Sequence, residues 1–152
     1  MSSINFNIYY IHNLESKRLF PQRPETSILK ITKEYFLKNS ELIQQSIDSF
    51  NSEISWDEMW DLGDCELRLN QNQTLYLLLD IDLPIGHVWY DMDYLYNAFV
   101  SKKRHDGDSA WFIQETMWDM KETNNLNSIK LYTDEWNIKS QKFWEKLGYT
   151  KI

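Results

Sequence analysis

Residues 129–149 read Ile-Lys-Leu-Tyr-Thr-Asp-Glu-Trp-Asn-Ile-Lys-Ser-Gln-Lys-Phe-Trp-Glu-Lys-Leu-Gly-Tyr and are the most informative part of the chain. Its first residues alternate between apolar and polar, which predicts a short strand. Asn137 is a favoured helix N-cap and Gly148 a favoured helix-terminating residue, so a helix is predicted between them. Tyr149 then starts a new extended segment. We therefore expect strand, turn, helix and a short strand in close succession.

The rest of the chain predicts a mixed α/β (α+β) fold in a single domain over residues 1–152. Pro84 and Gly86 predict a turn, and Ser55 is a candidate cap for a helix through Trp56, Met59 and Trp60. The element order predicts a mixed, mostly antiparallel central sheet flanked by helices, with strand 94–100 parallel to strand 128–133. The predicted strands are 4–11, 27–31, 74–81, 87–90, 94–100 and 128–133, and the other predicted helices are 33–50 and 109–123.

Composition excludes some classes of function. The formal net charge is -7, which argues against nucleic-acid binding. It is compatible with a cationic acceptor, although solubility alone is the simpler explanation. The single cysteine, Cys65, allows no internal disulfide and sits among acidic residues that raise a thiol pKa, so we expect a structural role in a reducing cytoplasm. No signal-peptide pattern is visible, and the apolar runs are too short for a membrane span.

A second informative stretch, residues 101–110, reads Ser-Lys-Lys-Arg-His-Asp-Gly-Asp-Ser-Ala and joins a predicted strand to a predicted helix. A helix N-terminus offers unpaired N–H groups, and a glycine lets the backbone approach a phosphate, so the stretch predicts a diphosphate cradle. Asp106 and Asp108 would repel a diphosphate unless they face solvent or Asp108 caps the helix. An ordinary strand–loop–helix joint remains an open alternative for this stretch.

Taken together, the two stretches resemble blocks of the GNAT acyltransferases, the acetyl-CoA-dependent N-acetyltransferases. The loop matches the phosphate loop of that family at Arg104 and Gly107. In the later block, the family pattern of Asn, a small residue and Tyr corresponds to Asn137, Ser140 and Trp144. The family's closing Gly-Phe pair is Gly-Tyr in this chain.

The resemblance implies a V-shaped splay between strands 94–100 and 128–133 that receives the pantetheine arm of acetyl-CoA. The implied co-substrate is acetyl-CoA, and the reaction requires no metal. The residues implied to bind it are Phe99, Val100, Ser101, Arg104, His105, Gly107, Asp108, Ser109, Ala110, Asn137, Ser140 and Trp144.

The implied reaction is direct attack of an amine on the thioester, with a backbone N–H of strand 94–100 stabilising the oxyanion. The implied catalytic residues are Asp93 and Tyr96. A hairpin-turn role for Asp93 and a core role for Tyr96 remain alternatives. The acceptor is implied to be a small amine or a peptide or protein amine, near residues 56–61, whose rings and acids could equally belong to an amphipathic helix.

Two departures from the family pattern keep other interpretations open. Trp144 stands where the family often has a tyrosine acid, so an acyl-CoA-binding module without catalysis is an alternative, as is an α/β interaction protein without a CoA site. Family members usually continue into a further hairpin, so we expect a shortened or missing C-terminal strand. Either residues 4–11 or a partner chain in a homodimer would then fill the vacant place in the sheet.

Overall fold

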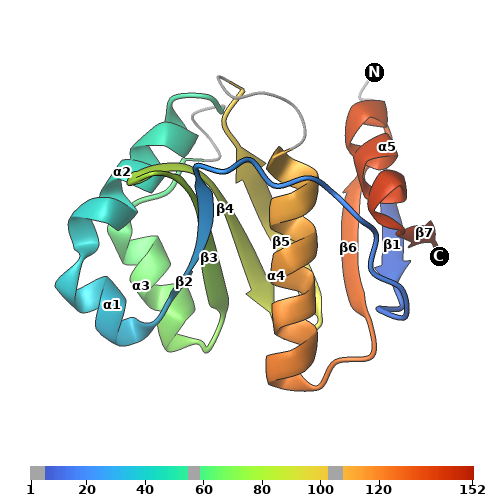
Figure 1. The fold of residues 1–152 in the computed structure, drawn as a ribbon, viewed down its shortest axis with the longest axis horizontal. Coiled ribbons are helices and arrows are strands. Elements are labelled where there is room, and N and C mark those ends of the chain that lie inside the picture. Colours follow the sequence, from blue (N-terminus) through green and yellow to red (C-terminus); the bar gives the residue numbers. More distant parts are fainter. Residues whose placement is uncertain (1–5, 55–58, 103–107) are drawn as a thin grey trace.

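The computed structural model describes residues 6–54, 59–102 and 108–152. Within these residues, seven strands form one sheet in the order β2-β3-β4-β5-β6-β1-β7, flanked by helices (Figure 1). The strands are β1 (Asn7–His12), β2 (Thr26–Ile31), β3 (Thr74–Asp80), β4 (Leu83–Asp91), β5 (Tyr94–Val100), β6 (Ile129–Asp134) and β7 (Thr150–Lys151). The helices are α1 (Lys33–Lys38), α2 (Ser40–Asn51), α3 (Leu62–Asn70), α4 (Asp108–Asn124) and α5 (Ile138–Leu147).

The sheet is mixed and mostly antiparallel, as the sequence predicts. Strands β2 to β5 pair antiparallel, and so do β6, β1 and β7. The contact between β5 and β6 is parallel. The helix α4 provides the crossover between these two strands, which is the connection that a parallel pair requires.

The first strand lies beside β6, on the side of β6 away from β5. Strand β1 pairs with β6 along its whole length, from Asn7 opposite Asp134 to His12 opposite Ile129. Strand β7 has only two residues and pairs with β1 at Tyr10 and Ile11. The intramolecular form of the sequence prediction is therefore confirmed.

Two apolar cores lie on opposite faces of the sheet. Alternation along β3 separates them, because Tyr76 and Leu78 belong to one core while Leu75 and Leu77 belong to the other. The first core includes α4 and α5, and the second includes α1, α2 and α3. Helix α4 contributes fully buried side chains such as Phe112, and burying a ring of that size contributes roughly 1.5–3 kcal/mol.

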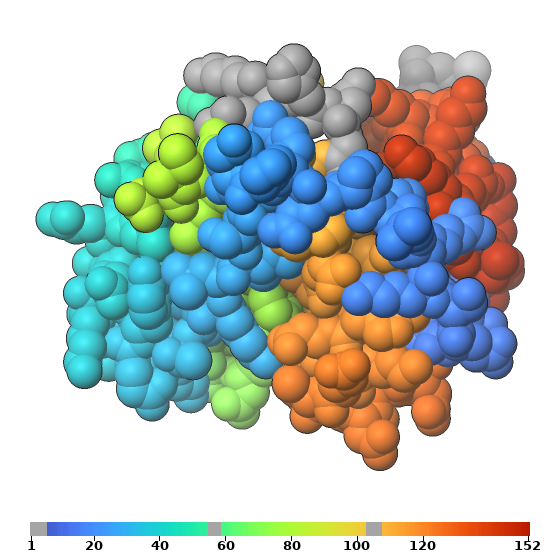
Figure 2. All heavy atoms as spheres, viewed as in Figure 1, coloured from blue at the N-terminus to red at the C-terminus, as the bar shows by residue number. Residues whose placement is uncertain are grey.

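Because β1 and β2 lie at opposite sides of the sheet, residues 13–25 must cross the face that carries α4. Figures 1 and 2 show this blue segment running over the orange helix. It is fixed to α4 by an ion pair between Lys17 and Glu115 at 2.8 Å and by hydrogen bonds between the Arg18 backbone and the Gln114 side chain. The crossing segment therefore holds α4 against the sheet.

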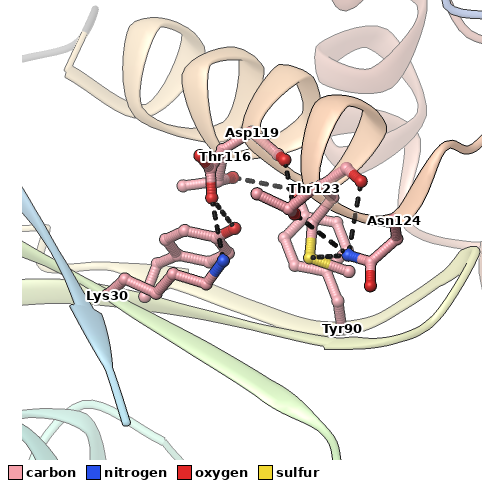
Figure 3. Close-up of polar contacts among 8 residues, drawn as sticks. Lys30, Tyr90, Thr116, Asp119, Thr123 and Asn124 are labelled. Atoms are coloured by element: carbon pink, nitrogen blue, oxygen red, sulfur yellow. Dashed lines mark hydrogen bonds and ion pairs between the residues drawn. The ribbon is translucent and has the colours of Figure 1, made fainter.

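The inner side of α4 is fixed by polar contacts to the sheet (Figure 3). The Tyr76 hydroxyl donates to the Asp119 carboxylate, which also receives Lys30 at 3.2 Å. The hydroxyls of Tyr90 and Thr116 lie 2.8 Å apart. These contacts fix the position of α4, whose first residues belong to the stretch predicted to bind a diphosphate.

Three local predictions are wrong. The helix predicted over 33–50 is divided at Asn39, which ends α1 and precedes α2. Helix α3 begins only at Leu62 because Asp61 forms a capping box with Asp64; the proposed cap Ser55 lies outside the described residues. Pro84 and Gly86 lie within β4, where the ladder with β3 is irregular and tolerates a residue without an N–H.

Within the described ranges, no helix is both long and apolar enough to cross a membrane.

Candidate active site

Strands β5 and β6 diverge after a single contact. Tyr94 lies opposite Lys130, and the Lys130 N–H donates to the Asp93 carbonyl at 2.7 Å. No further pairing joins the two strands in the described residues. The predicted V-shaped splay is therefore present, and beyond Tyr94 the edge of β5 that faces β6 is not paired with any strand of the described ranges.

A β-bulge interrupts β5 beside this splay. Trp89 lies opposite Asn97 and Tyr90 opposite Leu95, so Tyr96 is the extra residue. A bulge leaves its extra residue outside the regular ladder and changes the direction of the neighbouring side chains. The resemblance places an N–H donor for the oxyanion on this strand, without specifying the residue.

A groove of about 790 Å³ lies between β5, α4 and α5. That volume falls within the range of about 300–1,000 Å³ that is usual for ligand sites. Eight of the twelve residues that the resemblance implies for the cofactor line this groove: Phe99, Val100, Ser101, Ser109, Ala110, Asn137, Ser140 and Trp144. The sequence thus identified three separate elements that the fold brings to one surface.

The remaining four implied cofactor residues are not among those that line the groove. Arg104, His105 and Gly107 lie outside the described residues. Asp108 is the first residue of α4 and is buried, with an exposed fraction of 3%. Its carboxylate binds Arg23 of the crossing segment in two places, with Nε at 2.9 Å from Oδ1 and Nη2 at 2.8 Å from Oδ2.

The wall formed by α5 is ordered by side-chain hydrogen bonds. The Asn137 carboxamide oxygen accepts the Ser140 N–H at 3.1 Å and so caps the helix, as the sequence predicts. The Ser140 hydroxyl lies 3.1 Å from the Thr133 hydroxyl and accepts the Trp144 indole N–H at 3.1 Å. Gly148 ends the helix in the left-handed region, with φ of 107°.

Three further residues of α5 line the groove, and sequence analysis missed them. They are Lys139, Phe143 and Lys146. Their spacing of i, i+4 and i+7 places them on one face of the helix, and that signal could have found them. Together with Lys102, the two lysines give the groove three cations. Arg23 could not have been found in this way, because it reaches the site from a loop remote in sequence.

The two implied catalytic residues do not line this groove. Asp93 is about half exposed beside the vertex of the splay, and its carboxylate lies 3.6 Å from the Lys130 ammonium. The Tyr96 hydroxyl donates to the Gln73 side chain, and the Arg68 guanidinium lies 4.8 Å from the centre of its ring. Burial raises the pKa of Tyr96, so this phenol is a weak acid.

Trp60, which precedes α3, packs on the face of the sheet that carries α1, α2 and α3. Trp60 is held by Asn51, which donates to its carbonyl at 2.8 Å and accepts its N–H at 3.0 Å. Glu53 accepts hydrogen bonds from the Ser101 hydroxyl and the Lys102 N–H, each at 2.7 Å. The proposed acceptor residues at 56–58 lie outside the described residues.

Comparison with family models and with curated proteins finds no match for this chain. Solved structures do match it. An aminoglycoside acetyltransferase, meta-AAC0020 from an uncultured soil metagenomic sample, superposes with a TM-score of 0.63 at 17% identity over 82% of this chain and 88% of that one. This chain has the GNAT fold.

Longer GNAT proteins match over nearly the whole chain. A tandem GNAT protein from the clavulanic acid biosynthesis pathway has a TM-score of 0.62 at 10% identity, covering 99% of this chain and 51% of that one. A GCN5-related N-acetyltransferase from Sphaerobacter thermophilus has a TM-score of 0.64 at 10% identity, covering 98% and 49%. The chain spans about half the length of these two GNAT proteins.

Proposed function

We propose that this chain is an N-acetyltransferase that uses acetyl-CoA, with transfer by direct attack of an amine on the thioester. The observation that carries the proposal is the groove beside the β5–β6 splay, where eight residues implied by the family pattern meet. Direct acyl transfer depends on holding the amine and the thioester in line. A cleft between diverging strands can hold the thioester in a fixed position.

The groove suits a long ligand with anionic and amide groups. Lys102, Lys139 and Lys146 provide positive charge for phosphates. Unpaired backbone groups of β5 can pair with the amides of an extended pantetheine arm as an added strand would. The N-terminus of α4 faces the same groove through Ser109 and Ala110, and helix N-termini favour anions.

In the proposed mechanism, this chain positions the reactants and stabilises developing charge. Backbone groups of β5 orient the thioester, and an N–H near the bulge at Tyr96 stabilises the oxyanion. Asp93 accepts the amine proton, which places the acceptor near the vertex of the splay. The indole N–H of Trp144 is not acidic and is already bonded to Ser140, so Trp144 does not protonate the leaving group. The thiol of CoA leaves as the thiolate, because a thiol has a pKa of only about 8.5.

The acceptor is proposed to be an amine, and the net charge of -7 favours a cationic one. Three tyrosine rings lie in a row beside the splay. The ring centres of Tyr94 and Tyr132 are 6.1 Å apart, and those of Tyr132 and Tyr9 are 5.8 Å apart. Such rings can bind cationic amines. A trial panel therefore begins with aminoglycosides, polyamines and peptide amines. The proposed location is the cytoplasm.

A second candidate is an acyl-CoA-binding module without catalysis, which Trp144 in place of a tyrosine favours. Calorimetry with CoA, followed by detection of free thiol from acetyl-CoA across the amine panel, separates the candidates. Binding with amine-dependent thiol release supports the transferase. Binding without release on any amine supports the module, and absence of CoA binding contradicts both.

A further inference from the structure

His87 and Asn97 form a polar pair in an otherwise aromatic environment on the α1–α3 face of the sheet. His87 has an exposed fraction of 4%, and the rings of Phe50, Trp60 and Phe99 lie 5.0–5.8 Å from its own. Its Nε2 lies 2.5 Å from Oδ1 of Asn97. A buried histidine needs such a partner, because a buried N–H without a hydrogen bond is destabilising.

The pair fixes the tautomer of the histidine and the orientation of the amide. A carboxamide oxygen only accepts, so Nε2 of His87 carries the proton that it donates. Burial lowers the pKa of His87 to about 4, which keeps the ring neutral at physiological pH. The Asn97 oxygen is therefore turned toward His87 of β4, and its NH₂ group, at the other end of the amide, points away from His87.

The side of β5 away from β4 is the splay. Strand β6 pairs with β5 only at Tyr94, so no strand covers β5 beside Asn97 in the described residues. The side chain of Asn97 is half-buried, and no described residue accepts a hydrogen bond from its NH₂ group. Asn97 itself does not line the groove, but it directly follows the extra residue of the bulge and directly precedes Ala98, which lines the groove.

We propose that the Asn97 NH₂ group donates a hydrogen bond to the thioester carbonyl oxygen and that His87 is the positioning residue that holds it. This inference rests on the proposed function. The acceptor nitrogen forms a bond to the carbonyl carbon, and the carbonyl π electrons move to oxygen, where Asn97 stabilises the negative charge. The C–S bond then breaks, CoA leaves as the thiolate, and the amine proton passes to Asp93.

This role differs from simple packing of β4 on β5. A packing role predicts that truncating Asn97 lowers stability and leaves a bound thioester unaffected. The proposed role predicts a change in the carbonyl group itself, because a hydrogen bond polarises it. Acetyl-CoA labelled with ¹³C at the carbonyl reports this polarisation directly and requires no knowledge of the acceptor.

The test compares the ¹³C carbonyl shift of bound acetyl-CoA in the unmodified protein and in Asn97→Ala. Asn124→Ala is the matched control, since this amide lies on α4 and donates to the Met120 carbonyl at 3.3 Å. We expect a downfield shift in the unmodified protein and the control, and its loss in Asn97→Ala, with CoA affinity unchanged within about twofold. Turnover should fall about 10²–10³-fold, as for other lost oxyanion donors.

Two variants of the positioning residue complete the test. His87→Gln retains an N–H donor and should retain most of the carbonyl shift, whereas His87→Phe should lose it. An Asn97→Ala protein that binds acetyl-CoA with the unmodified carbonyl shift overturns the inference alone, as does a bound thioester with no shift in the unmodified protein. Failure of the unmodified protein to bind CoA instead overturns the proposed function.

Discussion

Arg23 and Asp108 are 85 residues apart in sequence and form a two-contact ion pair at the N-terminus of α4. The pair resolves a difficulty that the sequence presents, since a carboxylate at the start of this helix would repel a diphosphate. Arg23 neutralises that carboxylate and anchors the crossing segment at the same point. A residue from the start of the chain thus contributes to the electrostatics of the proposed cofactor site.

We expect Arg23→Ala to lower both stability and CoA affinity. Asp108 has an exposed fraction of 3%, so removing its partner leaves a buried charge uncompensated, at a cost of about 3 kcal/mol. The same charge should weaken CoA binding about tenfold. Thermal unfolding and calorimetry measure the two effects. The double variant Arg23→Ala/Asp108→Asn should recover most of both, and failure of the double variant to recover affinity would contradict the electrostatic explanation.

Gly86 allows β5 to approach β4 closely, and we expect Gly86→Ala to disturb the groove. An added Cβ would lie 2.7 Å from the Phe99 carbonyl oxygen and 3.0 Å from Cγ2 of Val100, and both residues line the groove. Backbone must therefore shift, so we expect a loss of about 1–3 kcal/mol and weaker CoA binding. Gly63→Ala is the control, because Gly63 lies in α3 and its added Cβ would have the carboxylate of the N-cap residue Asp61 as its nearest contact, at 3.2 Å. Equal effects of the two substitutions on CoA affinity would refute this role for Gly86.

The sequence could predict the C-terminal half of the molecule because local signals there agree with the final structure. Asn137 and Gly148 are favoured residues at helix ends, and they cap α5 as predicted. The alternation of apolar and polar residues predicts which side chains of β6 face the core. The approach of Arg23 to Asp108 could not be predicted, because it depends on where β1 lies in the sheet. Likewise, Pro84 is a turn signal that the irregular β3–β4 pairing overrides.

Strand β1 completes the sheet, so deletion of residues 1–12 should prevent folding. It supplies all the pairing partners of one edge of β6 and buries Tyr10 and His12. Without β1, the edge of β6 and the apolar side chains beneath α5 would be exposed. We expect loss of cooperative thermal unfolding and of CoA binding, checked by circular dichroism and calorimetry. A truncated chain that is folded and monomeric would show that β1 is dispensable.

His87 should make the stability of the protein depend on pH. Its pKa is lowered to about 4 by burial, whereas an unfolded histidine has a pKa of about 6.5, so the unfolded state binds more protons between these values. The free energy of unfolding should therefore fall as pH decreases from about 6.5 to 4, by about 3 kcal/mol from this group. His87→Gln should reduce this decline, and urea unfolding at several pH values measures it.

Burial also lowers the pKa of His12, so some pH dependence should persist. Identical pH dependence in both proteins would contradict the assignment to His87.

Asp93 provides the last prediction, which concerns proton transfer. Its carboxylate is about half exposed and lies 3.6 Å from the Lys130 ammonium, beside the vertex at which β5 and β6 separate. We expect Asp93→Asn to lower kcat at neutral pH about 10²-fold, the lower range for loss of a general base, while CoA affinity stays constant. The exposed ion pair itself contributes about 1 kcal/mol at most, so stability should change little.

Lys130→Met removes the same ion pair and retains the carboxylate, so it separates proton transfer from ion pairing. Turnover that falls equally in both variants would assign Asp93 a structural role, and unchanged turnover in Asp93→Asn would remove it from the mechanism.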